Sequence, residues 1–125
     1  MATRISGILF DLGETLLDYG PVRVGPLFRV GSRLAYDYVR SLGEPLPSFT
    51  RYHLQQLLAV RWNYLKSHIV DREFNALDVI RRMSRRMGQR LSDEQALELA
   101  RMWYRPLGEQ ATVEPDARAT LETFH

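Results

Sequence analysis

The stretch ISGILFDLGETLLDYG, residues 5–20, joins a short apolar run to an acid and a polar turn. The run from Ile5 to Phe10 shows no alternation of polar and apolar residues. Such a run is typical of a strand that is covered on both faces, as in a parallel sheet. We therefore expect a buried strand here, with Asp11 at its carboxyl end.

The rest of the chain carries the periodicity of amphipathic helices. Apolar stripes at i, i+3 and i+4 spacing predict helices over about 27–38, 54–69, 77–87, 96–103 and from about 115 onward. Asn75 and the pair Ser92 and Gln95 are expected to cap two of these helices at their N-termini. Gly43 is expected to end the first helix, and Pro106 with Gly108 the fourth.

Two tryptophans and a long stripe define the expected helical core. Trp62 and Trp103 both lie on apolar stripes and are predicted to be core residues. The clearest stripe, also expected to face inward, consists of Leu54, Leu57, Leu58, Trp62, Leu65 and Ile69.

This plan leaves the predicted strand without a partner. A lone buried strand cannot satisfy its backbone N–H and C=O groups, and no convincing second strand is found in residues 20–125. Either another chain, such as a second copy in a homodimer, completes the sheet, or the sequence is the N-terminal part of a longer protein whose later core segment is missing.

The composition narrows the class of protein. The chain has 125 residues, of which 45% are hydrophobic and 26% charged, as expected for one domain of a water-soluble protein. It contains no cysteine, which excludes disulfides and fits a cytoplasmic location. No apolar stretch approaches the roughly 20 residues that span a bilayer, so no membrane association is expected. The net charge of +2 is too small to indicate a nucleic-acid partner.

Asp11 is the first candidate for chemistry. In open α/β sheets, ligands bind beyond the carboxyl ends of the strands, where a carboxylate can act as a nucleophile or metal ligand. Gly13 is expected to allow an unusual φ and a close approach by ligand, and Thr15 to hold the loop or the carboxylate by hydrogen bonding. The alternative from spacing alone is an acid in an ordinary strand-to-loop turn.

The segment ILFDLGETLLD resembles the first motif of the haloacid dehalogenase-like hydrolase superfamily. The residues that match its common form are Phe10, Asp11, Leu12, Thr15, Leu16, Leu17 and Asp18. The organisation is similar to the subclass with a helical cap inserted after this motif, and VEPDARATLETF (113–124) looks like the return to the core. The resemblance implies an α/β, Rossmann-like core by family, of which this mostly α chain holds residues 1–19 as first strand and nucleophile loop, 20–110 as helical cap and 111–125 as return segment.

The resemblance also implies roles for individual residues. Asp11 would be the nucleophile that forms an aspartyl-phosphate and a ligand of Mg²⁺, the backbone carbonyl of Gly13 would be another ligand, and Thr15 would orient the motif. The substrate would be a small phosphorylated metabolite. The family also needs a Ser or Thr, a Lys and further acids on later strands. Lys66, the only lysine, falls in the cap region, so this chain alone should turn over nothing measurable.

Gly13 stands where phosphatases of this superfamily usually carry a second Asp, which protonates the leaving oxygen and later activates water. Glu14 is next to it, but adjacent residues of an extended turn point in different directions, so a surface acid is the simpler interpretation. Dehalogenase and phosphonatase branches also lack the second Asp, and the reaction stays open between them and the favoured phosphatase.

A rival interpretation is a non-catalytic helical binding module that completes its sheet with a partner chain. The basic segment RRMSRRMGQR, residues 81–90, is most simply the solvated face of a helix. His53, His68 and His125 have no ligand spacing with one another.

Overall fold

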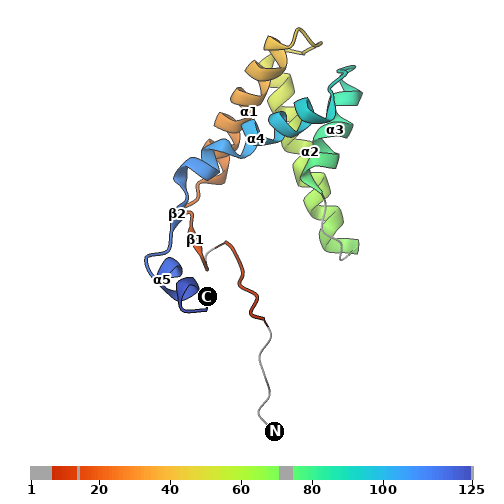
Figure 1. Ribbon diagram of the computed structural model, residues 1–125. Coiled ribbons are helices and arrows are strands. Elements are labelled where there is room, and N and C mark those ends of the chain that lie inside the picture. Colours follow the sequence, from red (N-terminus) through yellow and green to blue (C-terminus); the bar gives the residue numbers. More distant parts are fainter. Residues whose placement is uncertain (1–6, 14, 71–74, 125) are drawn as a thin grey trace. The chain divides into compact units, whose positions relative to one another are not determined.

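The computed structural model describes residues 7–13, 15–70 and 75–124. Within these residues the chain is mostly helical, as predicted, and its strands form one short pair (Figure 1). In chain order the elements are β1 (Leu17–Asp18), α1 (Val24–Ser41), α2 (Phe49–Val70), α3 (Ala76–Arg86), α4 (Asp93–Gln110), β2 (Thr112–Val113) and α5 (Ala117–Glu122).

The strand predicted at residues 5–10 is not formed where the structure describes this stretch. Residues 7–10 have no regular secondary structure, and Leu9 is 99% exposed. Ile5 and Ser6 lie outside the described residues. No described strand pairs with this run, and a strand without a neighbour leaves its backbone N–H and C=O groups unsatisfied.

The observed strands lie elsewhere in the chain. β1 and β2 pair antiparallel, with Leu17 opposite Val113 and Asp18 opposite Thr112. The N–H of Glu114 also donates to the carbonyl of Leu16 at 2.9 Å, which extends the pairing by one bond. Strand pairing was not expected in residues 20–125, because a two-residue strand carries no periodicity that a sequence can reveal.

The chain divides into two compact units. Met1–Val22 and Leu107–His125 form one unit, named here the terminal unit, and Arg23–Pro106 form the other, the helical unit. The paired strands both belong to the terminal unit. The chain therefore leaves this unit after β1 and returns to it before β2.

Helices α1 and α4 of the helical unit approach closely at a glycine. A methyl group at Gly31 would overlap the carbonyl oxygen of Trp103. The buried residues of α1 are small or β-branched, namely Gly31, Ser32, Ala35 and Val39. Small side chains let two helix backbones approach, so α1 is packed on its small-residue face. Val30, a larger apolar residue of the same helix, is 51% exposed.

The core of the helical unit combines this contact with an aromatic cluster. Ala35, Val39, Ile80 and Leu99 form the buried apolar centre. Tyr52, which is 1% exposed, stacks on Trp103 with ring centroids 6.3 Å apart, and Phe28 lies 4.9 Å from the same indole. Trp103 is partly buried and packs against the core as predicted.

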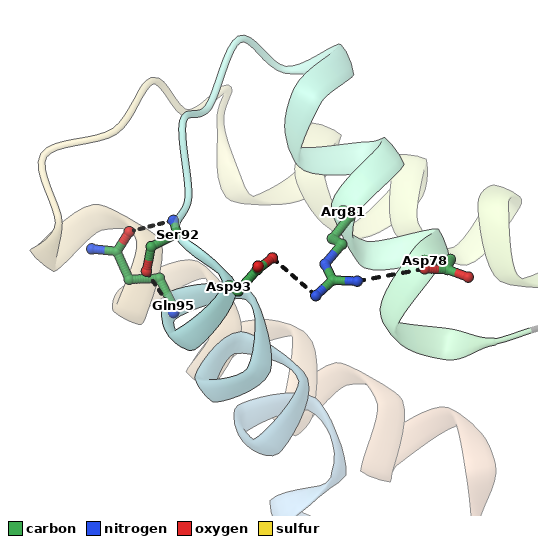
Figure 2. Close-up of polar contacts among 5 residues, drawn as sticks. All are labelled: Asp78, Arg81, Ser92, Asp93 and Gln95. Carbon is green, nitrogen blue, oxygen red and sulfur yellow. Dashed lines mark hydrogen bonds and ion pairs between the residues drawn. The ribbon is translucent and has the colours of Figure 1, made fainter.

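The predicted caps of α3 and α4 are confirmed. The Asn75 side chain accepts a hydrogen bond from the Leu77 N–H at 2.9 Å. The Ser92 N–H donates to Gln95 Oε1 at 2.9 Å, and the Gln95 N–H donates to Ser92 Oγ at 3.2 Å, which completes a capping box (Figure 2).

The long apolar stripe on α2 was predicted to face the core, and this prediction was wrong. Trp62, predicted to be a core residue, is 61% exposed, and most of the stripe is exposed with it. The residues of α2 that are buried are Tyr52 and Gln56, on the opposite side of the helix. Apolar residues occur all around α2, so the periodicity of its larger side chains did not identify the packed face.

Helix α4 continues past the expected stop. Pro106 lies inside the helix and is buried, and the last turn runs to Gln110. Proline removes one helical N–H donor, and burial of its ring in the helical unit offsets that loss here. None of the helices in the described ranges is long and apolar enough to cross a membrane.

Candidate active site

Asp11 lies at the start of a tight turn. Its side chain is exposed, and Oδ1 accepts a hydrogen bond from the Leu12 N–H at 2.9 Å. This bond joins neighbouring residues and uses one oxygen of the carboxylate.

A single backbone turn follows the acid. The N–H groups of Leu16 and Leu17 both donate to the carbonyl of Leu12, at 3.1 and 3.0 Å. The second bond spans five residues, which makes the turn wider than one α-helical turn. The turn leads directly into β1, so the loop that carries Asp11 ends on a paired strand.

Gly13 does not have the unusual backbone conformation expected for it. It is absent from the described glycines with positive φ, which are Gly20, Gly43 and Gly88. A Cβ at Gly13 would lie 3.5 Å from a ring carbon of Tyr19, an ordinary contact. The backbone therefore has room for a side chain at this position.

Thr15 is exposed in the turn. Among the residues that the structure describes, its hydroxyl makes no hydrogen bond to Asp11 or to the loop backbone. The structure does not bring Thr15 onto the carboxylate as the sequence suggested. Glu14 lies outside the described residues.

Gln110 is a residue of this region that the sequence did not reveal. Its Nε2 donates to the carbonyl of Tyr19 at 2.5 Å and to the carbonyl of Pro21 at 3.1 Å. Gly20, between these acceptors, has a φ of 63° and its N–H donates to Asp18 Oδ1 at 2.7 Å. A glutamine near the end of a helix gives no pattern that points to a loop so distant in the chain.

The donor set for Mg²⁺ is incomplete. The described residues contain no cluster of three His, Cys, Asp or Glu side chains that could hold a metal ion. Asp11 and the Gly13 carbonyl would provide two oxygen ligands, whereas Mg²⁺ takes six in an octahedron and is usually held by one or two carboxylates, waters and a phosphate. The residues present therefore do not form a metal site by themselves.

Two polar residues of the helical unit, Arg81 and Tyr36, have structural partners. Arg81 forms ion pairs with Asp93 at 3.0 Å and with Asp78 at 3.7 Å, which links α3 to the start of α4 (Figure 2). The Tyr36 hydroxyl donates to the Pro47 carbonyl at 2.9 Å. These contacts account for both residues by packing and pairing within the helical unit.

Comparison of the chain with protein-family models, with curated proteins and with solved structures finds no match.

Proposed function

We propose that this chain carries the first catalytic motif and the helical cap of a haloacid dehalogenase-like hydrolase that acts on a small phosphorylated metabolite. The observation that carries the proposal is the combination of the motif at residues 10–18 with the place of the helical insertion. The insertion begins directly after the loop of Asp11, and the chain pairs β1 with β2 where it returns.

This arrangement supports the proposal because an inserted domain must leave and re-enter its host at neighbouring points. The pairing of Asp18 with Thr112 provides such a closure for residues 23–106. A cap held in this way can vary in its own fold without disturbing the loop that presents Asp11.

The proposed chemistry uses the free oxygen of Asp11. A carboxylate oxygen of Asp11 attacks phosphorus, the bond from phosphorus to the ester oxygen breaks, and the alkoxide leaves with a proton from solvent. Water then attacks the phosphorus of the aspartyl-phosphate, which releases inorganic phosphate and restores the carboxylate. Mg²⁺, when bound by a complete site, would neutralise charge on the phosphoryl oxygens.

The missing groups would come from polypeptide beyond the residues of this chain. The proposal requires a Ser or Thr at a second strand tip, a lysine and one or two acids, none of which the resemblance assigns to residues 1–125. The 125-residue chain by itself is expected to show no hydrolysis above background.

The genomic sequence that follows codon 125 provides the first test. We expect it to encode an apolar strand ending in Ser or Thr, then a Lys and an acid pair. The protein that includes them should hydrolyse p-nitrophenyl phosphate with Mg²⁺ and stop with EDTA. A stop codon at this point, with a stable dimer of the 125-residue chain on sizing, would contradict the proposal.

Two substitutions in that longer protein test the roles of individual residues. Asp11→Asn should abolish turnover and remove a hydroxylamine-labile phosphate from the peptide that contains residue 11, whereas Asp37→Asn, on the exposed face of α1, should change neither. Gly13→Asp should raise turnover of alkyl phosphates more than that of p-nitrophenyl phosphate, because alkoxides are the poorer leaving groups and gain more from an acid. Unchanged turnover in Asp11→Asn would remove Asp11 from the mechanism.

A further inference from the structure

Helix α2 presents a long apolar face to solvent. Five side chains, which we name the α2 stripe, are between 51% and 75% exposed: Leu54, Leu58, Trp62, Leu65 and Ile69. Their spacing of four, four, three and four residues places them on one face of the helix over about 22 Å. Isolated exposed leucines are ordinary, but a contiguous row with a tryptophan at its centre marks an interaction surface.

The middle of the stripe borders a groove between α2 and α3. This groove has a volume of about 380 Å³ and is lined by Gln55, Leu58, Ala59, Trp62, Met83, Arg86 and Met87. Leu58 and Trp62 line it from α2, Met83 from α3, and Met87 from the residue that follows α3. Methionine side chains adjust their shape to an incoming group, which suits a groove that receives side chains of a partner.

A second, smaller hollow of about 120 Å³ continues the groove and shares Trp62 and Met83 with it. Arg86 lines both hollows, and the smaller one is also lined by Lys66 and Arg82. The two hollows together are therefore lined by apolar side chains and by the cations Lys66, Arg82 and Arg86.

The charged side chains of α2 are all positive. Helix α2 contains Arg51, Arg61 and Lys66 and no Asp or Glu between Phe49 and Val70. Among the residues that the structure describes, no carboxylate lines either hollow. Within the described ranges, no acidic side chain forms an ion pair with Arg61, Lys66 or Arg86. Among the described residues, these cations that flank the apolar surface have no acidic partner.

We propose that the α2 stripe and the α2–α3 groove bind an acidic amphipathic helix of another protein. Apolar side chains of such a helix at i, i+3 or i+4, and i+7 would enter the groove beside Trp62, and its flanking carboxylates would meet Lys66, Arg82 and Arg86. This inference does not depend on the proposed hydrolase function.

Two other occupants fit the same surface less well. A second copy that pairs its stripe with this one would oppose cations with cations, because α2 brings no acid of its own. An anionic bilayer would attract the cations, but its flat surface has no side chains to fill a groove of about 380 Å³.

The test uses the whole 125-residue chain and a labelled synthetic peptide of about 18 residues, long enough for a stable amphipathic helix. The peptide carries Leu on one face and Glu on the flanks. Fluorescence anisotropy should show saturable micromolar binding that weakens as salt is raised, together with a blue shift of tryptophan emission as Trp62 is covered. A scrambled peptide of the same composition should bind at least about tenfold more weakly.

Variants locate the site on the protein. Trp62→Glu should weaken binding by about tenfold or more, whereas Val30→Glu, an equally drastic change at an exposed position of α1, should leave it unchanged. The double variant K66E/R86E should lose the acidic peptide and gain affinity for a peptide with Lys in place of Glu. An unfolded chain would attract ordered and scrambled Lys peptides equally, so a gain confined to the ordered peptide separates loss of the site from loss of the fold.

Several results would overturn the proposal. Equal binding of the ordered and scrambled peptides would show unspecific attraction, and no saturable binding up to millimolar peptide would show that no such partner is recognised. Binding of anionic vesicles that Trp62→Glu abolishes, without binding of the peptide, would assign the surface to a membrane. Dimerisation that Trp62→Glu abolishes would assign it to a second copy of the chain.

Discussion

The side-chain amide of Gln110 lies 2.5 Å from the carbonyl oxygen of Tyr19, across a sequence separation of 91 residues. The same amide reaches the Pro21 carbonyl at 3.1 Å, and the hydroxyl of Thr112 lies 3.4 Å from the Asp18 carbonyl. These bonds add to the two paired positions of β1 and β2. The closure of the terminal unit therefore depends on a few polar contacts rather than on a long ladder.

Gln110→Met should weaken this closure, because methionine keeps the length of the side chain and removes both donor hydrogens. Two hydrogen bonds to carbonyls are lost, and we expect a loss of about 1–2 kcal/mol in the free energy of unfolding. Faster hydrogen exchange at the N–H groups of Gly20 and Glu114 should accompany it. Arg118→Met, on the exposed surface of the same unit, should change stability by less than about 0.5 kcal/mol. Equal exchange rates in both variants would show that Gln110 does not hold the loop.

Gly31→Ala should destabilise the helical unit, because the new methyl group overlaps the carbonyl oxygen of Trp103. The contact involves backbone on both sides, so relief requires α1 and α4 to separate. We expect a loss of about 1–3 kcal/mol in unfolding free energy, measured by denaturant titration.

Gly108→Ala is the matched control for that change. It also lies inside a helix, nothing lies within 4 Å of a Cβ at this position, and alanine favours the helix by up to about 1 kcal/mol. The two variants should therefore change stability in opposite directions. A stabilising effect of Gly31→Ala would show that α1 and α4 do not approach as described.

Ser92→Ala should shorten or loosen the start of α4, because it removes the acceptor for the Gln95 N–H. The expected cost is about 1 kcal/mol, and Ser92→Asp should retain most of the stability. Hydrogen bonds from its own backbone N–H and from the Ser92 hydroxyl lower the pKa of Glu94. In Ser92→Ala this pKa should rise toward its ordinary value, which carboxyl-detected NMR titration can follow. An unchanged titration would contradict a role for the Ser92 hydroxyl.

Local signals predicted the helices well. Asn75 and the pair Ser92 and Gln95 act on backbone groups two or three residues away, so the sequence contains all that is needed to place these helix starts. Gly43, with a φ of 73°, follows the end of α1 for the same local reason. Pro106 was wrongly predicted to end α4. Its burial depends on residues distant in the sequence, and this burial outweighs the loss of one backbone N–H donor.

Burial was predicted less well, because it depends on which helix face another helix covers. On α1 the small residues Gly31 and Ala35 pack, since close approach to α4 needs little side-chain volume. On α2 the packed face contains Tyr52 and Gln56, and the larger apolar residues are left on the outside. Hydrophobicity alone favoured the wrong face of α2, whereas on α1 Tyr38 packs against the core and Val30 is exposed.

The sequence predicted which residue types form the candidate site, but it did not predict how these residues are arranged in space. Asp11 precedes a turn, as the sequence suggested, but Thr15 does not contact it and Gly13 has an ordinary φ. The pairing of Asp18 with Thr112 joins segments separated by the whole helical unit. Long-range pairs of this kind leave no periodic trace in a single sequence.

Tyr52 should make the stability of the helical unit depend on pH at the alkaline end. The residue is 1% exposed, and burial raises the pKa of its hydroxyl well above the value of about 10 for a free tyrosine. A raised folded-state pKa means that the stability is fully present below about pH 10. Above that pH the unfolded chain loses the proton while the folded chain keeps it, so unfolding becomes easier by up to about 1.4 kcal/mol per pH unit.

Tyr52→Phe should flatten this part of the pH–stability curve, and Tyr64→Phe, at a residue that is 60% exposed, should leave it as in the original chain. Denaturant titrations between pH 8 and pH 11 (the range that brackets the free tyrosine value) measure the difference, and equal slopes in the two variants would show that Tyr52 ionises as readily in the folded protein as in the unfolded one.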